Sequence, residues 1–359
     1  MTPAIGIRRL VVAAVAAATA LSTVGLAPSA TAAPSSDTGL YGAADPTYDG
    51  VYRQSLAVMG LAANDKAAPT SAITWLLGQQ CADGSFQAYR ADTTQACAKP
   101  DPVNFSGPDT NSTAVALMAL MALDNDRVRI PAATVSRIVD AADKAGRWLR
   151  NQQNPDGGWP YFSGGASDAN STGLALSAIL TQAPSFRLPA YTKARLFLGR
   201  LSASCPDGGG FPYQAGGKVD GSATAQGLVG ITGPLPVRGP RTLAAKAPCL
   251  NTAKARAASY LAGQLRANGH LMSPYGSGPD YTNTGWAVLG LVAARQGRTA
   301  VATATADLKS AAKAETSNAD GPVPGDLGLF LLVAEATGSS PTNFGGVNLI
   351  SALAGSIRR

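Results

Sequence analysis

The segment Asp168-Ala-Asn-Ser-Thr172-Gly-Leu-Ala175 recurs with small changes at three other places in the chain. The three are Asp109-Thr-Asn-Ser-Thr113-Ala-Val-Ala116, Asp220-Gly-Ser-Ala-Thr224-Ala-Gln-Gly227 and Asp280-Tyr-Thr-Asn-Thr284-Gly-Trp-Ala287. Each has Thr four residues after the Asp and a small residue seven after it, and the starts lie 59, 52 and 60 residues apart. Self-similarity of this kind indicates an array of similar units. We therefore expect a functional site assembled from several repeats.

Helical patterns alternate with Gly- and Pro-rich loops from about Tyr48 onward. One set of predicted helices covers about 51–63, 110–123, 169–182, 221–232, 281–296 and 325–337. A second set, interleaved with the first, covers about 69–80, 132–152, 189–203, 251–267, 299–315 and 342–355. Alternation of β-branched residues is nearly absent, so no sheet is predicted.

The two sets of helices differ in where they place apolar residues. The first set is apolar almost all round, as in 114–122, and such helices are buried on every side. The second set is amphipathic with Arg and Lys on one face, as in 141–150, which suits an outer layer. The sequence therefore predicts an all-α fold, an (α/α)6 toroid with six inner and six outer helices.

A second repeat lies where the predicted outer helices end. The copies are Gln79-Gln-Cys-Ala-Asp-Gly-Ser-Phe-Gln-Ala-Tyr89, Gln152-Gln-Asn-Pro-Asp-Gly-Gly-Trp-Pro-Tyr161, Cys205-Pro-Asp-Gly-Gly-Gly-Phe-Pro-Tyr213 and a degenerate Gln264-Leu-Arg-Ala-Asn-Gly-His-Leu-Met-Ser-Pro-Tyr275. Asp-Gly and Asn-Gly favour turns that end a helix, because Gly accepts a positive φ. We expect the aromatic residue that follows to pack back on the helix end.

The segment from Lys144 to Trp159 resembles the QW repeat of squalene and oxidosqualene cyclases and of prenyltransferase β-subunits, through Trp148-Leu, Gln152 and Gly157-Gly-Trp159. Residues 75–86 are a weaker match. Ser171-Thr-Gly-Leu-Ala-Leu-Ser-Ala178 is also similar to segments of the cobalamin carriers transcobalamin and intrinsic factor. The resemblance covers about 48–340 and implies the α/α toroid. The carriers add a smaller β-domain, for which this sequence leaves no room.

The activities of these families do not carry over residue by residue. The Asp-x-Asp-Asp motif of the triterpene cyclases is missing, and the predicted inner helices offer few aromatic residues for carbocations, apart from Trp286. The zinc ligands of the prenyltransferases are missing too, since the chain has one His, His270. We therefore predict no metal, and the sequence requires no cofactor.

A glycosidase needs two carboxyl groups on either side of the scissile bond. Glu occurs only at Glu315 and Glu335, so the pair would come from repeat residues such as Asp168 and Asp220. A polysaccharide lyase built from Asp, Tyr and a bound calcium ion is the related alternative.

The repeat predicts where a ligand would bind. Asp at the start of each inner helix places the four Asp residues at one end of the ring, and the loop tyrosines lie just upstream. We expect a rim of such residues, with Ser222 and Asn283, around a mostly apolar cavity. The ligand-binding candidates are Asp109, Asn111, Tyr161, Asp168, Asn170, Tyr213, Asp220, Gln226, Tyr275, Asp280, Tyr281 and Trp286.

Helix capping is the competing interpretation of the repeated Asp residues. Asp, Asn, Ser and Thr are the preferred N-caps, and they satisfy the N–H groups of the first turn. Departures from the repeat are better candidates for specificity. Gln226 and Trp286 occupy the position filled by Val115 and Leu174, and Tyr281 is a further departure.

The N-terminus resembles a targeting segment. Arg8 and Arg9 precede an apolar run that ends in small residues, so residues 1–32 are predicted to be a signal peptide. Residues 33–46 are a predicted flexible lead-in, and 47–359 a single toroid domain. We expect a secreted protein with no membrane span in the mature chain. Without Arg8 and Arg9 the net charge falls from +7 to +5, spread along the chain, which does not indicate nucleic-acid binding.

The four cysteines allow three disulfide pairings, and an exported chain favours disulfides. Cys81–Cys97 and Cys205–Cys249 are the favoured pairs, because each would close a loop between neighbouring helices. A thiolate metal site is the alternative.

Taken together, these patterns favour a secreted, non-catalytic binding protein for a small or amphipathic ligand, such as an isoprenoid, a cofactor-like molecule or a glycan. The alternatives are an enzyme of the terpene-cyclase or prenyltransferase type and an Asp-based polysaccharide-active enzyme. The ligand and the oligomeric state are not readable from the sequence.

Overall fold

The structure is a computed structural model that describes residues 38–124, 126–185, 188–274 and 276–359. The predicted signal peptide, 1–32, and residues 33–37 of the predicted lead-in lie outside the described residues. The described residues belong to one compact unit.

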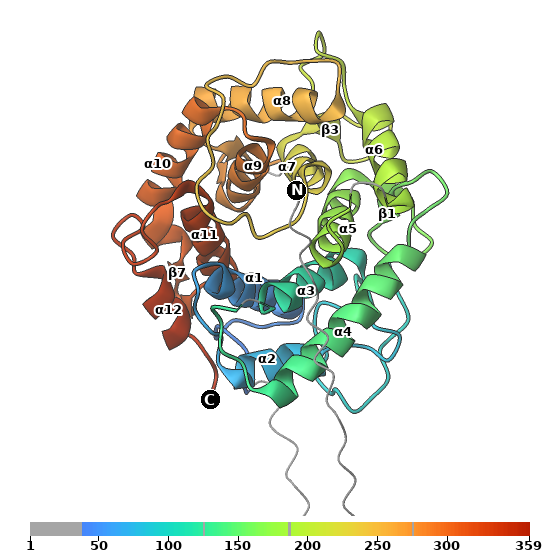
Figure 1. Cartoon of the computed structure of the whole chain (residues 1–359), viewed down its shortest axis with the longest axis vertical. Helices are drawn as coiled ribbons and strands as arrows, with labels where there is room; N and C mark the ends of the chain where they lie inside the picture. Colours follow the sequence, from blue (N-terminus) through green and yellow to red (C-terminus); the bar gives the residue numbers. More distant parts are fainter. Residues whose placement is uncertain (1–37, 125, 186–187, 275) are drawn as a thin grey trace, which may run out of the picture. The chain divides into compact units, whose positions relative to one another are not determined.

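Two layers of helices surround a common axis (Figure 1). The inner helices are α1 (Gly50–Ala63), α3 (Thr110–Ala122), α5 (Ala169–Gln182), α7 (Gly221–Thr232), α9 (Tyr281–Ala294) and α11 (Pro324–Thr337). The outer helices are α2 (Thr70–Gly78), α4 (Ala132–Asn151), α6 (Pro189–Leu201), α8 (Ala253–Asn268), α10 (Arg298–Glu315) and α12 (Leu349–Gly355). Each inner helix contacts the next, and α11 contacts α1, so the inner layer closes. The predicted all-α toroid is confirmed.

The inner helices approach one another closely because glycines face their neighbours. A Cβ atom at Gly173 of α5 would collide with the backbone carbonyl of Gln226 in α7, and one at Gly230 would collide with Gly173. Gly60 of α1 and Gly328 of α11 make the same kind of contact. The central parts of these helices are fully buried, as expected for helices that are apolar on every side.

The last predicted helix, 342–355, is wrong at its start. Helix α12 begins only at Leu349, where the Asn348 side chain accepts a hydrogen bond from the backbone N–H of Ser351 at 3.0 Å. The preceding residues form a turn through Gly345 and Gly346, whose φ values of 60° and 84° are incompatible with a helix.

The sequence predicts no sheet, whereas the described residues contain four two-stranded ribbons with two residues in each strand. They are β1–β2 (Trp159–Pro160 with Ser167–Asp168), β3–β4 (Phe211–Pro212 with Val219–Asp220), β5–β6 (Leu271–Met272 with Pro279–Asp280) and β7–β8 (Ser317–Asn318 with Gly321–Pro322). Such short strands leave no alternation in the sequence. In the first three, the register places a buried residue opposite the repeat Asp, as Trp159 is opposite Asp168.

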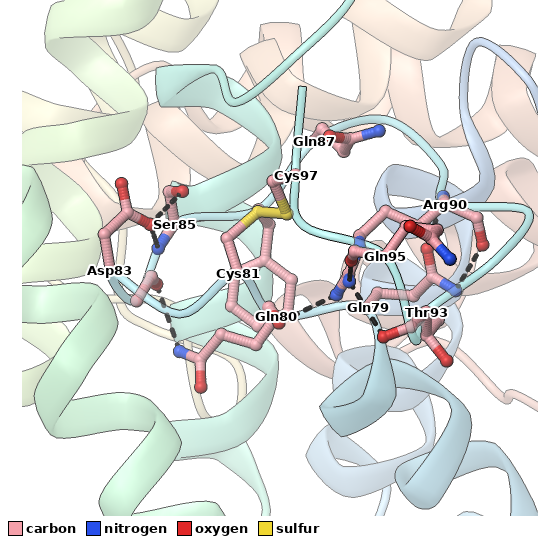
Figure 2. The surroundings of a disulfide bond; sticks show 12 residues. Gln79, Gln80, Cys81, Asp83, Ser85, Gln87, Arg90, Thr93, Gln95 and Cys97 are labelled. Carbon is pink, nitrogen blue, oxygen red and sulfur yellow. Dashed lines mark hydrogen bonds between the residues drawn. A yellow bond between two sulfur atoms is a disulfide. The ribbon is translucent and has the colours of Figure 1, made fainter. Parts of the chain in front are cut away.

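Cys81 is bonded to Cys97 and Cys205 to Cys249, which is the pairing favoured from the sequence, so the thiolate metal site is not retained. The first disulfide lies in the loop between α2 and α3 (Figure 2). Beside it, the guanidinium of Arg90 donates to the backbone carbonyls of Gly78, Gln80, Thr93 and Gln95 at 2.6–3.2 Å. This buried cation fixes a loop that has no regular secondary structure.

No helix in the described ranges combines the length and the apolar character needed to cross a membrane.

Candidate functional site

A cavity of about 570 Å³ lies where the N-terminal ends of the inner helices meet. Helices α1, α3, α5, α7 and α9 supply residues to it, and the loops before them supply others. The predicted candidates in its wall are Asn111, Tyr161, Asp168, Asn170, Tyr213, Asp220, Gln226 and Asp280. The other wall residues are Tyr48, Asp49, Tyr52, Ser112, Ser171, Ser222, Ser273, Pro274 and Asn283.

The repeated Asp residues are helix caps. Asp109, Asp168, Asp220 and Asp280 each accept a hydrogen bond from the backbone N–H three residues later, at 2.7, 2.7, 2.6 and 2.9 Å. This is the N-cap geometry, which satisfies part of the first turn. Three of the four also line the cavity, so capping and access to a ligand are compatible there.

Burial changes the protonation of these carboxyl groups. Asp168 is fully buried, and loss of solvent raises its pKa to about 6, although the backbone N–H and the hydroxyl of Ser171 oppose the change. Asp109 is 1% exposed, and burial raises its pKa to about 6 as well. Burial also raises the pKa of Asp220, and the charge of Asp280 adds to that effect. The cavity wall therefore contains a carboxyl group, that of Asp168, whose pKa lies at about 6.

The loop tyrosines reach across to the preceding repeat. The carbonyl of Tyr161 accepts from the backbone N–H of Thr110, the first residue of α3, at 2.9 Å. The carbonyl of Tyr213 accepts from the backbone N–H of Ala169, the first residue of α5, also at 2.9 Å. Burial, and then the charge of Asp109, raise the pKa of Tyr161. Each tyrosine is thus held over the start of its neighbour's inner helix.

A chain of amide and hydroxyl groups joins three inner helices in the cavity wall. The Nδ2 of Asn170 donates to the Oγ of Ser222 at 3.1 Å and to the Oε1 of Gln226 at 3.2 Å. The Ser222 hydroxyl donates to the Oδ1 of Asn283 at 3.1 Å, and the Nδ2 of Asn283 donates to Asp280 at 2.8 Å. These bonds hold the side chains in fixed directions before any ligand binds.

The described part of the cavity wall has an unused acceptor and no cationic side chain. The Oδ1 of Asn111 is buried and has no hydrogen-bond partner among the described residues. No Lys, Arg or His belongs to that part of the wall, whereas Asp49, Asp168, Asp220 and Asp280 do. The nearby Arg53 forms an ion pair with Asp49 at 3.0 Å. The wall therefore favours ligands that donate hydrogen bonds.

Four of the predicted candidates do not line this cavity. Trp286 is fully buried, and its indole N–H lies near the Tyr52 hydroxyl without forming an aligned hydrogen bond. Burial raises the pKa of Tyr52, and the indole N–H partly opposes that rise. Tyr281 instead lies against the ring of His270, with 5.7 Å between ring centres. Asp109 is buried near Tyr161, where its charge helps to raise the pKa of the phenol, and Tyr275 lies outside the described residues.

The wall of the cavity carries more polar groups than expected. Every wall residue except Pro274 has a polar group in its side chain, although more of the wall surface is apolar than polar. The apolar faces of the inner helices pack against one another and against the outer layer, and this cavity lies at the polar starts of those helices.

The wall residues Tyr48, Asp49 and Tyr52, at the start of α1, were not predicted from the sequence, because that helix departs from the repeat. Asp49 precedes α1 as the other Asp residues precede their helices, but Arg53 stands where the repeat has Thr. Asp49 makes no side-chain cap and is paired with Arg53 instead. An alignment by helix starts, rather than by the Thr, would have included Tyr48, Asp49 and Tyr52.

Within the described ranges, no three His, Cys, Asp or Glu side chains are grouped closely enough to hold a metal ion.

No protein-family model and no curated protein matches the sequence. Among solved structures, a glycosidase superposes with a TM-score of 0.51 and 13% identity, over 84% of this chain and 92% of its own. Its fold is the α/α toroid. Looser superpositions include ent-copalyl diphosphate synthase from Streptomyces platensis, with a TM-score of 0.48, 17% identity, and 80% of this chain but only 50% of the synthase covered. A type II terpene cyclase from Scytonema has a TM-score of 0.44 and 14% identity, over 76% and 70% of the two chains. At these identities the likeness shows the fold alone.

Proposed function

We propose that the protein binds a small molecule rich in hydroxyl or amide groups in the cavity at the N-terminal ends of the inner helices. The observation that carries this proposal is the wall itself, in which all residues but Pro274 are polar and none is cationic. The hydrogen-bonded amides of Asn170, Gln226 and Asn283 supply directed donors and acceptors. Tyr161 and Tyr213 supply ring faces on which an apolar surface of the ligand can rest.

The charge of the wall argues against anionic ligands. An isoprenoid diphosphate would meet the carboxyl groups of Asp168, Asp220 and Asp280 without a Lys or Arg in the wall to neutralise it. A terpene-cyclase reaction also fits poorly. Its acid would be an Asp of raised pKa in apolar surroundings, and Asp168 has the raised pKa, but its carboxyl group accepts hydrogen bonds from the backbone N–H and the hydroxyl of Ser171.

Two classes of ligand are uncharged, donate hydrogen bonds and have an apolar surface. Saccharides present hydroxyl donors around rings with apolar faces, and corrinoids present amide donors around a flat macrocycle. The corrinoid class is supported by the resemblance of 171–178 to the cobalamin carriers, and the saccharide class by carboxylate and tyrosine side chains in one cavity.

Isothermal titration calorimetry with neutral oligosaccharides and with cyanocobalamin tests the proposal. We expect one class to bind with one site per chain. Gln226→Met should weaken that binding by about 1–3 kcal/mol, because it removes the amide of Gln226 that would bond to the ligand and one of the two acceptors that orient the Asn170 amide. Gln153→Met is a matched control, since Gln153 bonds to the backbone of Gly157 and Ala190 away from this cavity. Absence of binding in both classes contradicts the proposal.

Glycoside cleavage is a second candidate, favoured by the protonation of the cavity carboxyl groups. A glycosidase pairs one carboxyl group of raised pKa with a second carboxylate. Asp168, with a pKa of about 6, and Asp280 both line the cavity. Release of reducing ends from a neutral oligosaccharide that is abolished by Asp168→Asn would establish this activity. Binding without turnover would leave the chain a carrier.

We further propose that the protein is exported. The N-terminal pattern of 1–32 and the two disulfides support this, since disulfides persist in oxidising compartments. Mass determination of the protein from culture supernatant, with a mature N-terminus near residue 33, tests it.

A further inference from the structure

A second cavity, of about 500 Å³, lies at the other end of the inner helices. Its wall is made by the C-terminal ends of α9 and α11, by one face of α10 and by residues 240–243 of the loop before α8. Val292 in this wall lies nine residues beyond Asn283 in the polar cavity, both in α9. At 1.5 Å per residue the two sites are roughly 14 Å apart along that helix.

The floor of this second cavity is apolar. Val292, Val301 and Ala336 are core residues, each less than a tenth exposed, whose outer surfaces form the floor, and Leu243 closes one side. A cavity of this size with an apolar floor is typical of small-molecule sites.

The rim of the cavity is cationic. Arg241, Arg298 and Lys309 line it, and no acidic side chain does. None of the three forms an ion pair with an acid among the described residues. The Nζ of Lys309 lies 5.6 Å from the ring centre of Phe344, which is a cation–π contact rather than a neutralising one. The neighbouring Glu335 accepts from the backbone N–H of Gly239 at 2.8 Å.

The positive groups are held in place by the backbone. The N–H of Ala244 donates to the carbonyl of Arg295, and the N–H of Arg298 donates to the carbonyl of Ala244, both at 3.0 Å. The loop that carries Arg241 is therefore fixed against the turn between α9 and α10. Burial and the positive charge of Arg295 lower the pKa of Arg241. The positive end of the α10 dipole adds to the same field.

We propose that this cavity binds an anionic amphiphile, a carboxylate or phosphate ester attached to an alkyl chain. The head group would accept charge-assisted hydrogen bonds from Arg241 and Arg298, Lys309 would add positive charge farther along α10, and the chain would cover the apolar floor. The site is separate from the polar cavity and does not depend on what binds there.

Titration of the full chain with dodecanoate, dodecyl phosphate and dodecanol tests the proposal. We expect the two anions to bind with one site per chain and the neutral alcohol to bind roughly tenfold more weakly, because it lacks the charge-assisted bonds. Arg241→Gln combined with Arg298→Gln should weaken dodecanoate roughly tenfold or more. Arg137→Gln on the exposed face of α4 removes a positive charge elsewhere and should leave the affinity unchanged.

The apolar floor has its own test. Ala302 is exposed and lines the cavity, so Ala302→Trp should fill it and abolish binding without disturbing the core. Ala314→Trp, at an exposed position of the same helix outside the cavity, is the matched control. Equal affinities for dodecanoate and dodecanol, or an affinity insensitive to Ala302→Trp, would overturn the proposal.

The amphiphile could be free or part of a bilayer. Flotation with vesicles of phosphatidylglycerol, compared with phosphatidylcholine, distinguishes the two sources. Binding to phosphatidylglycerol vesicles that Ala302→Trp abolishes assigns the site to a membrane lipid, and binding to dodecanoate alone assigns it to a free amphiphile. If Ala302→Trp still binds the vesicles and the protein does not bind dodecanoate, the proposal that this cavity binds an amphiphile is overturned.

Discussion

The backbone N–H of Phe211 donates a hydrogen bond to the hydroxyl oxygen of Thr224 over 2.9 Å, and both residues are fully buried. The hydroxyl donates onward to the carbonyl of Asp220 at 2.6 Å. The backbone N–H groups of Phe86, Trp159 and Leu271 donate in the same way to Thr113, Thr172 and Thr284, at 2.8–2.9 Å. The repeated Thr therefore ties each loop to the inner helix that it precedes, and so positions the residues of the polar cavity.

Thr224→Val should destabilise the protein by about 1–3 kcal/mol, because the nearly isosteric methyl group leaves the buried N–H of Phe211 without an acceptor. Urea unfolding measures the change. Thr224→Ser should recover most of the loss, since it restores the hydroxyl. Thr192→Val on the exposed face of α6 is the control and should cost less than about 0.5 kcal/mol. Equal effects at the two positions would mean that the hydroxyl of Thr224 is not structural.

The stability of the wild-type protein relative to Asp168→Asn should fall as the pH rises. Because the folded pKa of Asp168, about 6, lies above its ordinary value of 3.8, the folded state keeps a proton that the unfolded state releases. That contribution is complete below about pH 4 and is lost as the pH rises through 6. Asparagine stays neutral and still caps α5.

Thermal unfolding of both proteins between about pH 4 and pH 7 measures this effect, which should reach at most about 3 kcal/mol. The carboxyl group of Asp109 titrates in both proteins and cancels in the comparison. A difference in melting temperature that stays constant across this range would show that Asp168 is ionised throughout.

Gly173→Ala should destabilise the toroid by roughly 1–3 kcal/mol or prevent folding, because the new Cβ would overlap the backbone carbonyl of Gln226. Gly199→Ala on α6 is the matched control, since nothing lies within 4 Å of its Cβ position. That change should stabilise the protein by about 0.5–1 kcal/mol, as Ala does in a helix. Far-UV circular dichroism during urea unfolding compares the two, and a tolerated Gly173→Ala would contradict the close packing of α5 and α7.

Removing the disulfide Cys205–Cys249 with two Ser substitutions should cost more stability than removing Cys81–Cys97. The sequence separations are 44 and 16 residues, so the loop-entropy relation gives about 4 and about 3 kcal/mol. Guanidinium unfolding of the two double variants checks the order. If removal of Cys81–Cys97 costs more, the four hydrogen bonds of Arg90 depend on that disulfide, and its loss lowers stability by more than loop entropy alone.

The fold was predictable because the period of the repeat and the two kinds of helix face follow directly from residue order. The start of α12 was not, because Gly345 and Gly346 lie inside an otherwise helical pattern, and their positive φ values depend on the contact with α10. The two-residue strands are set by pairing with the repeat Asp, which leaves no local signal.

The end of the ring that holds the candidate site was predictable from the Asp positions, but the chemistry of its wall was not. Spacing places Trp286 and Gln226 at the same position of their helices, yet Trp286 is fully buried while Gln226 reaches Asn170. The contribution of Tyr48 and Tyr52 was missed because α1 has Arg53 in place of the repeat Thr.

Native mass spectrometry of the protein isolated from the organism that makes it tests the central claim most directly. The account predicts a non-covalent adduct of a neutral, hydroxyl- or amide-rich molecule, with one copy per chain, which is depleted in Gln226→Met and retained by Gln153→Met. A protein that carries no adduct, and that binds neither oligosaccharides nor cyanocobalamin when they are added, would contradict it.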